Sequence, residues 1–103
     1  MKAPEINNQQ EFFDLNEEDW KRADPEVLPK KGDQIILESM AMPMGGLLDL
    51  DDEMMGFKAH YYRGTFIEAN EAYCSWENLA GTKCSPHHMS GVRVVPKDRV
   101  WEI

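Results

Sequence analysis

Long apolar runs and basic clusters are both missing from this 103-residue sequence, and cysteine is scarce. No stretch approaches the roughly 20 apolar residues that a membrane-spanning helix needs, and the polar residues 1–10 lack the apolar core of a signal peptide. The net charge of −8 disfavours binding to nucleic acids and anionic lipids, because both repel an acidic chain. Two cysteines without an export signal indicate a reduced, cytoplasmic protein.

Motifs for catalysis and for tight metal binding are missing as well. Four side chains are potential zinc ligands: Cys74, Cys84, His87 and His88. Their spacing, Cys-x9-Cys-x2-His-His, lacks the close cysteine pair of most zinc sites. Four acids begin like a calcium loop but lack its glycine and its final glutamate: Asp49, Asp51, Asp52 and Glu53. Because no phosphate-binding glycine loop is present and no Cys/His pair has an evident oxyanion hole, we expect no metal, no cofactor and no enzymatic activity.

The sequence is instead rich in methionine, leucine and acid over residues 38–55. This stretch holds five methionines and three leucines, and residues 33–56 carry six acids and no base. Pro43 and the Gly45-Gly46 pair disfavour both strand and helix there. Methionine is typical of adaptable interfaces, so an irregular segment that its own chain buries poorly indicates a surface for another molecule. The alternative is that these side chains form a small satellite core beneath the loop.

The first third of the chain is acidic and weakly patterned. Residues 1–10 are polar and indicate disorder, whereas residues 11–23 have helical spacing that ends at Asp24-Pro25. In that helix Asn16 resembles an N-cap, with Asp19 in an acidic first turn. We interpret residues 1–32 as an acidic extension, partly helical or disordered, and expect removal of residues 1–25 to spare the rest of the fold.

Short segments with alternating apolar residues follow, separated by turn residues. They predict strands over residues 34–38, 57–68, 72–76, 92–95 and 99–103. Arg63-Gly64 predicts a bulge or bend inside the second of these. Five or six short strands predict an all-β fold, a small β-barrel over residues 33–103 with a long loop at about residues 39–56. The final strand would leave an edge for a neighbouring subunit.

Five segments, taken in order, carry a family resemblance. Lys31-Gly32-Asp33 precedes an apolar run, Met44-Gly45-Gly46-Leu47-Leu48 joins two glycines to two aliphatic residues, and Arg63-Gly64 opens the strand after the loop. The others are residues 74–83, with an aromatic residue and a Gly-Thr turn, and residues 96–103, with an acid before a short aliphatic run. Together they resemble the GroES-type small co-chaperonins over residues 31–103. Residues 1–30 have no counterpart, and the hairpin near residues 69–72 is expected to be shortened or absent.

The resemblance implies a GroES-like β-barrel with a mobile loop, assembled as a homo-oligomer of seven subunits. Such a ring would cap a GroEL-type chaperonin in the cytoplasm and assist ATP-dependent protein folding, the ATPase belonging to the chaperonin. The loop residues that would contact the chaperonin are Met44, Gly45, Gly46, Leu47, Leu48 and Leu50. Trimmed versions of this family are found in bacterial viruses, which leads to the hypothesis of a viral protein acting in the host cytoplasm.

Two other hypotheses stay open. A small acidic binding or inhibitory protein would act on a host protein through Phe12, Phe13 and Trp20. A zinc-stabilised module would use the Cys/His set, and metal content after purification tests it. A partner that protects residues 40–55 favours the co-chaperonin, whereas a partner that protects the N-terminal third favours the acidic binding protein.

Overall fold

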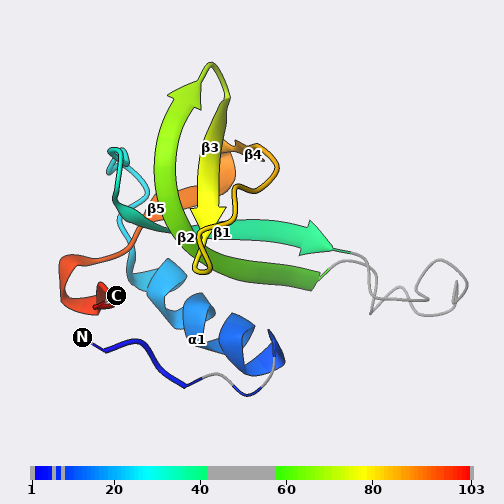
Figure 1. Cartoon of the computed structure of the whole chain (residues 1–103), viewed down its shortest axis with the longest axis vertical. Coiled ribbons are helices and arrows are strands. Elements are labelled where there is room, and N and C mark those ends of the chain that lie inside the picture. Colours follow the sequence, from blue (N-terminus) through cyan, green and yellow to red (C-terminus); the bar gives the residue numbers. More distant parts are fainter. Residues whose placement is uncertain (1, 6, 8, 42–57, 103) are drawn as a thin grey trace, which may run out of the picture.

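The computed structural model describes residues 2–5, 7, 9–41 and 58–102, which form one antiparallel five-stranded sheet and one α-helix (Figure 1). In chain order the elements are α1 (Gln9–Arg22), β1 (Gln34–Ala41), β2 (Lys58–Asn70), β3 (Tyr73–Asn78), β4 (His87–His88), the 3-10 turn η2 (Met89–Gly91), β5 (Val92–Val94) and the 3-10 turn η3 (Lys97–Arg99). No helix among these residues is long and apolar enough to cross a membrane.

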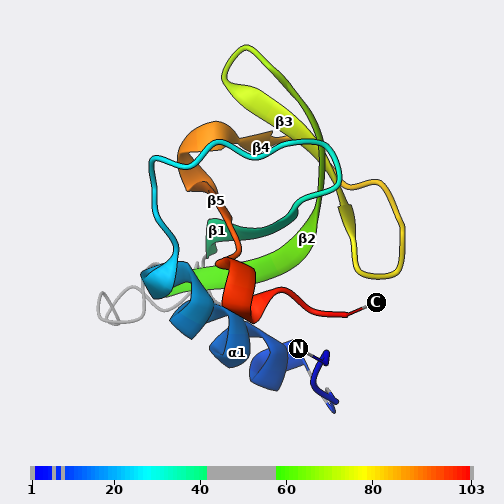
Figure 2. The ribbon, with the colours of Figure 1, turned by 90° about the vertical axis from the view of Figure 1, so that its left-hand side faces the viewer.

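The sheet is a meander whose last strand returns to the first. Its strand order is β4-β3-β2-β1-β5, and β5 pairs with β1 through Ile35↔Val94 and Leu37↔Val92. Among the described residues β4 and β5 are the two edges, so strand pairing leaves the sheet open rather than closed into the predicted barrel. The predicted β-rich class is therefore confirmed in its coarse form, with one helix added to a single bent sheet (Figure 2).

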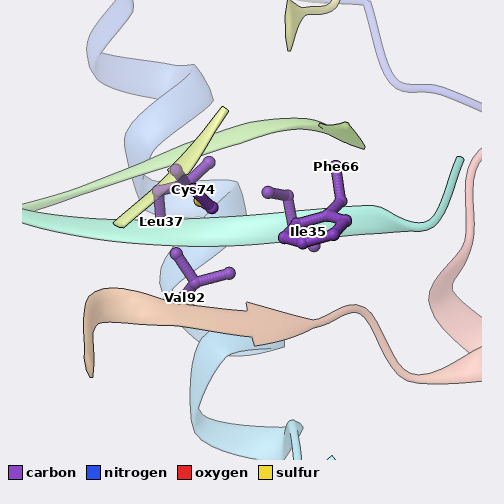
Figure 3. Close-up of a cluster of buried hydrophobic side chains, with 5 residues drawn as sticks. All are labelled: Ile35, Leu37, Phe66, Cys74 and Val92. Atoms are coloured by element: carbon purple, nitrogen blue, oxygen red, sulfur yellow. The ribbon is translucent and has the colours of Figure 1, made fainter. Parts of the chain in front are cut away.

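Alternation along β1 divides the buried side chains between two faces of the sheet. On one face Ile35 and Leu37 pack with residues from β2, β3 and β5 (Figure 3): Phe66, Cys74 and Val92. On the other face Ile36 packs with Tyr61 and Val95, and with Trp20 from α1. The helix therefore covers the second face of the β1–β2 pair and completes its core.

One stripe of side chains is buried in residues 15–23, the part of α1 and its C-terminal end whose side chains the structure describes. Asn16, Asp19, Trp20 and Ala23 are buried, at the i, i+3, i+4, i+7 spacing of a helix face, whereas Leu15 is 42% exposed. The N-cap interpretation of Asn16 is wrong, because the helix begins seven residues earlier at Gln9. Asn16 lies mid-helix, and its Nδ2 donates to the Tyr61 carbonyl at 3.2 Å. A polar residue on the buried face thus resembled a cap in sequence but serves to attach the helix to β2.

Strand β2 runs unbroken through the predicted bend at Arg63-Gly64. The pairing between β2 and β3 shifts register between Phe66 and Glu68 instead. Gly64 is needed for a different reason: a Cβ there would collide with the Trp76 ring and the Glu77 carbonyl, both within 2.8 Å. The glycine therefore marks a close approach of β3 to β2, and β2 curves between its pairing with β1 and its pairing with β3 (Figure 1).

The predicted closing strand over residues 99–103 is also wrong. The chain makes the η3 turn there, with the Arg99 N–H donating to the Pro96 carbonyl, and Trp101 is then buried. Glu102 forms an isolated parallel bridge with Lys2, which brings the two ends of the chain together (Figure 1). The C-terminal segment is thus engaged within its own chain, where the sequence pattern predicted an edge for a neighbouring subunit. Strand β4, only two residues long, was not predicted.

Candidate functional site

The predicted contact residues fall in a segment that joins two paired strand ends. Met44, Gly45, Gly46, Leu47, Leu48 and Leu50 all lie within residues 42–57, outside the described residues. The flanking positions are described: β1 and β2 pair in continuous register to Met40↔Ala59 and Ala41↔Lys58. Paired residues of antiparallel strands have Cα atoms about 4.5–5.5 Å apart. The residues that flank the segment, Ala41 and Lys58, therefore lie next to each other at one end of the hairpin.

A buried ionic network fixes this hairpin to α1 and to the C-terminal segment. The Asp19 carboxylate accepts from Arg63 Nη1 at 2.9 Å and from Arg99 Nε at 2.7 Å. Arg63 Nη2 donates to the Arg99 carbonyl at 2.7 Å and to Gln34 Oε1 at 3.1 Å. The Gln34 side chain in turn donates from Nε2 to the Trp101 carbonyl and accepts the Trp101 N–H at Oε1. One guanidinium thus joins the helix, both hairpin strands and the end of the chain.

The Arg63 side chain is 0% exposed, which makes its charge costly to leave unpaired. Burial lowers the pKa of Arg63, and the hydrogen bond and charge of Asp19 oppose that shift. The guanidinium also stacks 3.9 Å from the centre of the Trp101 ring. Arg63 is therefore a structural anchor, and the resemblance that assigned it to the strand after the loop gave no indication of this role.

Cys74 and His87 pair across β3 and β4, but each of the four potential zinc ligands is engaged in other contacts. Cys74 is in the core, where burial raises the pKa of its thiol, and the Cys84 thiol lies 3.5 Å from the Thr82 carbonyl. His87 Nε2 bonds to the Glu38 carbonyl at 2.8 Å, and His88 Nδ1 bonds to the Ser90 hydroxyl at 2.8 Å. In the described part of the chain no three His, Cys, Asp or Glu side chains gather as a metal site.

A pocket of about 440 Å³ opens beside the hairpin, close to where β1 leads into residues 42–57. Among the described residues its lining includes no Asp, Glu, Lys or Arg; the described lining residues are Ser39, Tyr62, Trp76, Asn78, Cys84, Ser85, Pro86 and His87. The indole of Trp76 donates to the Ser85 carbonyl at 3.0 Å, which holds the ring against the pocket wall. Cys84 and His87 share this pocket, but each is bonded to a backbone carbonyl as described above, so the geometry does not form a nucleophile and base pair.

The aromatic residues of the alternative hypothesis do not form one exposed surface. Trp20 is 7% exposed and packs against Tyr61, with ring centres 5.6 Å apart. Arg93 covers its other side, 4.1 Å from the ring centre, and donates to the Trp20 carbonyl at 2.9 Å. The side chains of Phe12 and Phe13 lie outside the described residues. A contact surface that needs Trp20 is therefore wrong.

Sequence reasoning missed the ionic network, although the sequence contained one weak indication of it. Arg63 falls on the same alternate positions of its strand as Ala59 and Tyr61, and a charge on such an apolar face usually has a buried partner. In comparisons with known proteins, no family model, no curated protein and no solved structure matches this chain.

Proposed function

We propose that the protein is a binding module that presents residues 42–57 to a partner protein from the end of the β1–β2 hairpin. The observation that carries this proposal is the continuous register to Ala41↔Lys58, which holds both ends of an acidic, methionine- and leucine-rich segment together. The helix and the buried Arg63–Asp19 pair make the hairpin a firm base for it. Held ends reduce the conformational entropy that such a segment loses on binding.

The partner class that fits best is a GroEL-type chaperonin, with this chain as its co-chaperonin. The support is the order of the sequence segments, above all Met44-Gly45-Gly46-Leu47-Leu48 in the connection between β1 and β2. A GroES-like barrel and a ring of seven subunits are parts of the same proposal. The engaged C-terminal segment removes the edge first expected to join such subunits, so a ring would need a different contact.

The energetics favour many weak contacts over one strong contact. Burying Leu47 and Leu48 would contribute about 1.5–3 kcal/mol each, whereas ordering six residues costs about 6–12 kcal/mol. A single segment would then bind weakly and release readily. Several segments on one assembly would raise the affinity by orders of magnitude, because later contacts become intramolecular.

Leu47→Asp and Leu48→Asp test this proposal. Each is expected to weaken one arm by about 10- to 150-fold, the factor that corresponds to one buried leucine, and so to abolish capture by an immobilised GroEL-type chaperonin in the presence of nucleotide. The matched control is Leu79→Asp, which changes a leucine that is 38% exposed in the turn after β3. Equal capture of the wild-type chain and both loop variants, with unchanged melting temperatures, would refute the assignment.

A further inference from the structure

A second surface has the features of a peptide-binding groove. It has a volume of about 400 Å³ and is lined by residues of the segment 27–34, the end of β5 and the η3 turn. Gln34 at this groove begins β1, whereas residues 42–57 follow its last residue, Ala41. The groove thus lies at one end of β1, and the residue that precedes 42–57 lies at the other end, about 23 Å away at roughly 3.3 Å per residue.

The groove collects exposed aliphatic side chains. Six large apolar residues are exposed in the described part of the chain, and three of them line this groove: Leu28 at 76%, Val27 at 47% and Val100 at 37%. Val94 and Val95 add to the same lining. Exposed aliphatic residues are ordinary when they are scattered, but their concentration in a groove of this size indicates a binding surface.

Two of the three described charged side chains that line the groove are basic, although the whole chain is acidic. Lys30 and Lys97 line it, and neither ammonium belongs to an ion pair among the described residues. The acid that lines it, Asp33, is engaged locally, because its Oδ2 accepts the Lys30 N–H at 2.8 Å. A chain of net charge −8 therefore presents two available ammonium groups here, which favours an acidic ligand.

The walls of the groove are fixed before any ligand arrives. The Gly32 N–H donates to the Phe66 carbonyl and the Phe66 N–H donates to the Asp33 carbonyl, both at 2.9 Å, so the turn is attached to β2. Gly32 has a φ of +92°, which favours glycine at this turn. On the other side the Val95 N–H donates to the Gln34 carbonyl at 2.9 Å. A preformed groove loses little entropy when it binds.

Strand β5 also offers backbone groups. It is an edge of the sheet, paired on one side with β1. Because the Val95 N–H points to β1, strand alternation directs the N–H and carbonyl of Val94 to the opposite edge, which no described strand covers. An extended peptide can pair with such an edge while its side chains enter the neighbouring groove.

We propose that this groove binds an extended, acidic segment of a partner protein, in which adjacent aliphatic side chains are flanked by carboxylates. The aliphatic side chains contact Leu28, Val27 and Val100, the carboxylates face Lys30 and Lys97, and the backbone pairs with the outer edge of β5. Together with the proposed function, on which this last step rests, the inference gives the protein two binding surfaces with which it can join two polypeptides.

Fluorescence anisotropy with a short labelled peptide tests the groove. The probe carries two central leucines with aspartates on both sides, and the control peptide has lysine in place of each aspartate. We expect the acidic peptide to bind the full chain, with an affinity that falls as the salt concentration rises. We expect no binding of the basic peptide. Leu28→Asp is expected to reduce the affinity about tenfold or more, and so is the double variant Lys30→Glu with Lys97→Glu.

Two variants outside the groove are matched controls, Leu79→Asp for the exposed leucine and Lys83→Glu for the charge, and both should bind like the wild-type chain. All changed side chains are exposed, so melting temperatures should stay within a few degrees. Unchanged binding by Leu28→Asp, or equal binding of the two peptides, overturns the proposal. A native mass that shows a dimer lost only in Leu28→Asp also overturns it, because the groove would then be an interface between copies of this chain.

Discussion

Asp19→Ala is expected to destabilise the protein by about 3–5 kcal/mol, the usual cost of removing one partner from a buried ion pair. The Arg63 side chain is fully buried, and Asp19 is the carboxylate that neutralises it at 2.9 Å. Without Asp19 the guanidinium keeps only neutral acceptors, the Arg99 carbonyl and Gln34 Oε1. Against a total stability of about 5–15 kcal/mol for a domain of this kind, such a loss is large.

Urea unfolding followed by tryptophan fluorescence measures this loss. The matched control is Glu17→Ala, on the same helix, which removes an exposed pair with Lys21 at 3.9 Å. That pair is worth at most about 0.5 kcal/mol. A loss below about 1 kcal/mol for Asp19→Ala would mean that Arg63 reaches water, and that the network does not anchor the hairpin.

Removal of residues 1–25 is expected to abolish cooperative unfolding of the remaining chain. The sequence alone predicted that this removal would spare the fold. The structure indicates the opposite, because this segment supplies Trp20 and Asp19 to the contacts with the sheet. Its loss would expose Ile36, Tyr61 and Val95 and leave Arg63 without a counter-charge. Circular dichroism during heating, compared with the full chain, measures the result.

A point variant separates packing from chain length in this test. Trp20→Ala is expected to cost about 3–5 kcal/mol, as truncation of a large core aromatic does, and Leu15→Ala on the exposed side of α1 about 0.5 kcal/mol or less. A fragment of residues 26–103 that melts cooperatively near the temperature of the full chain would show that the helix is dispensable.

Local pattern was sufficient to predict the elements with a compact apolar run or a helical period. Residues 34–38 hold the apolar run from Ile35 to Leu37, and β1 lies there; the helix over residues 11–23 was displaced by only one or two residues at its ends. The turn between β2 and β3 lies at Glu71 and Ala72, and Glu71 has a φ of 58°, in keeping with the tight hairpin expected near residues 69–72. In these places local propensity and tertiary packing favour the same structure.

The errors arose where a long-range contact decided the local structure. Asn16 carries the chemistry of a cap, but its partner is the carbonyl of Tyr61, 45 residues away. Residues 99–103 alternate like a strand, yet the Arg99 side chain is directed to Asp19 and its carbonyl to Arg63, and the chain turns to make both bonds. Contacts of this separation leave no periodic signal, so pattern reasoning could not find them.

The candidate groove was equally hidden from the sequence. Val27 and Leu28 looked like an extended lead-in to the first strand, because two aliphatic residues between turns show no period. Only the fold brings them beside Val100 and Lys97, some 70 residues later in the chain. The segment at residues 42–57, by contrast, stood out through its composition alone.

Hydrogen exchange of the chain with and without a GroEL-type chaperonin and nucleotide tests the central claim most directly. The account predicts that the chaperonin slows exchange within residues 42–57, that α1 and the five strands exchange as in the free chain, and that Leu47→Asp removes the effect. Absence of any slowing over residues 42–57, or slowing confined to the N-terminal third, would contradict the assignment of that segment as the chaperonin-binding surface.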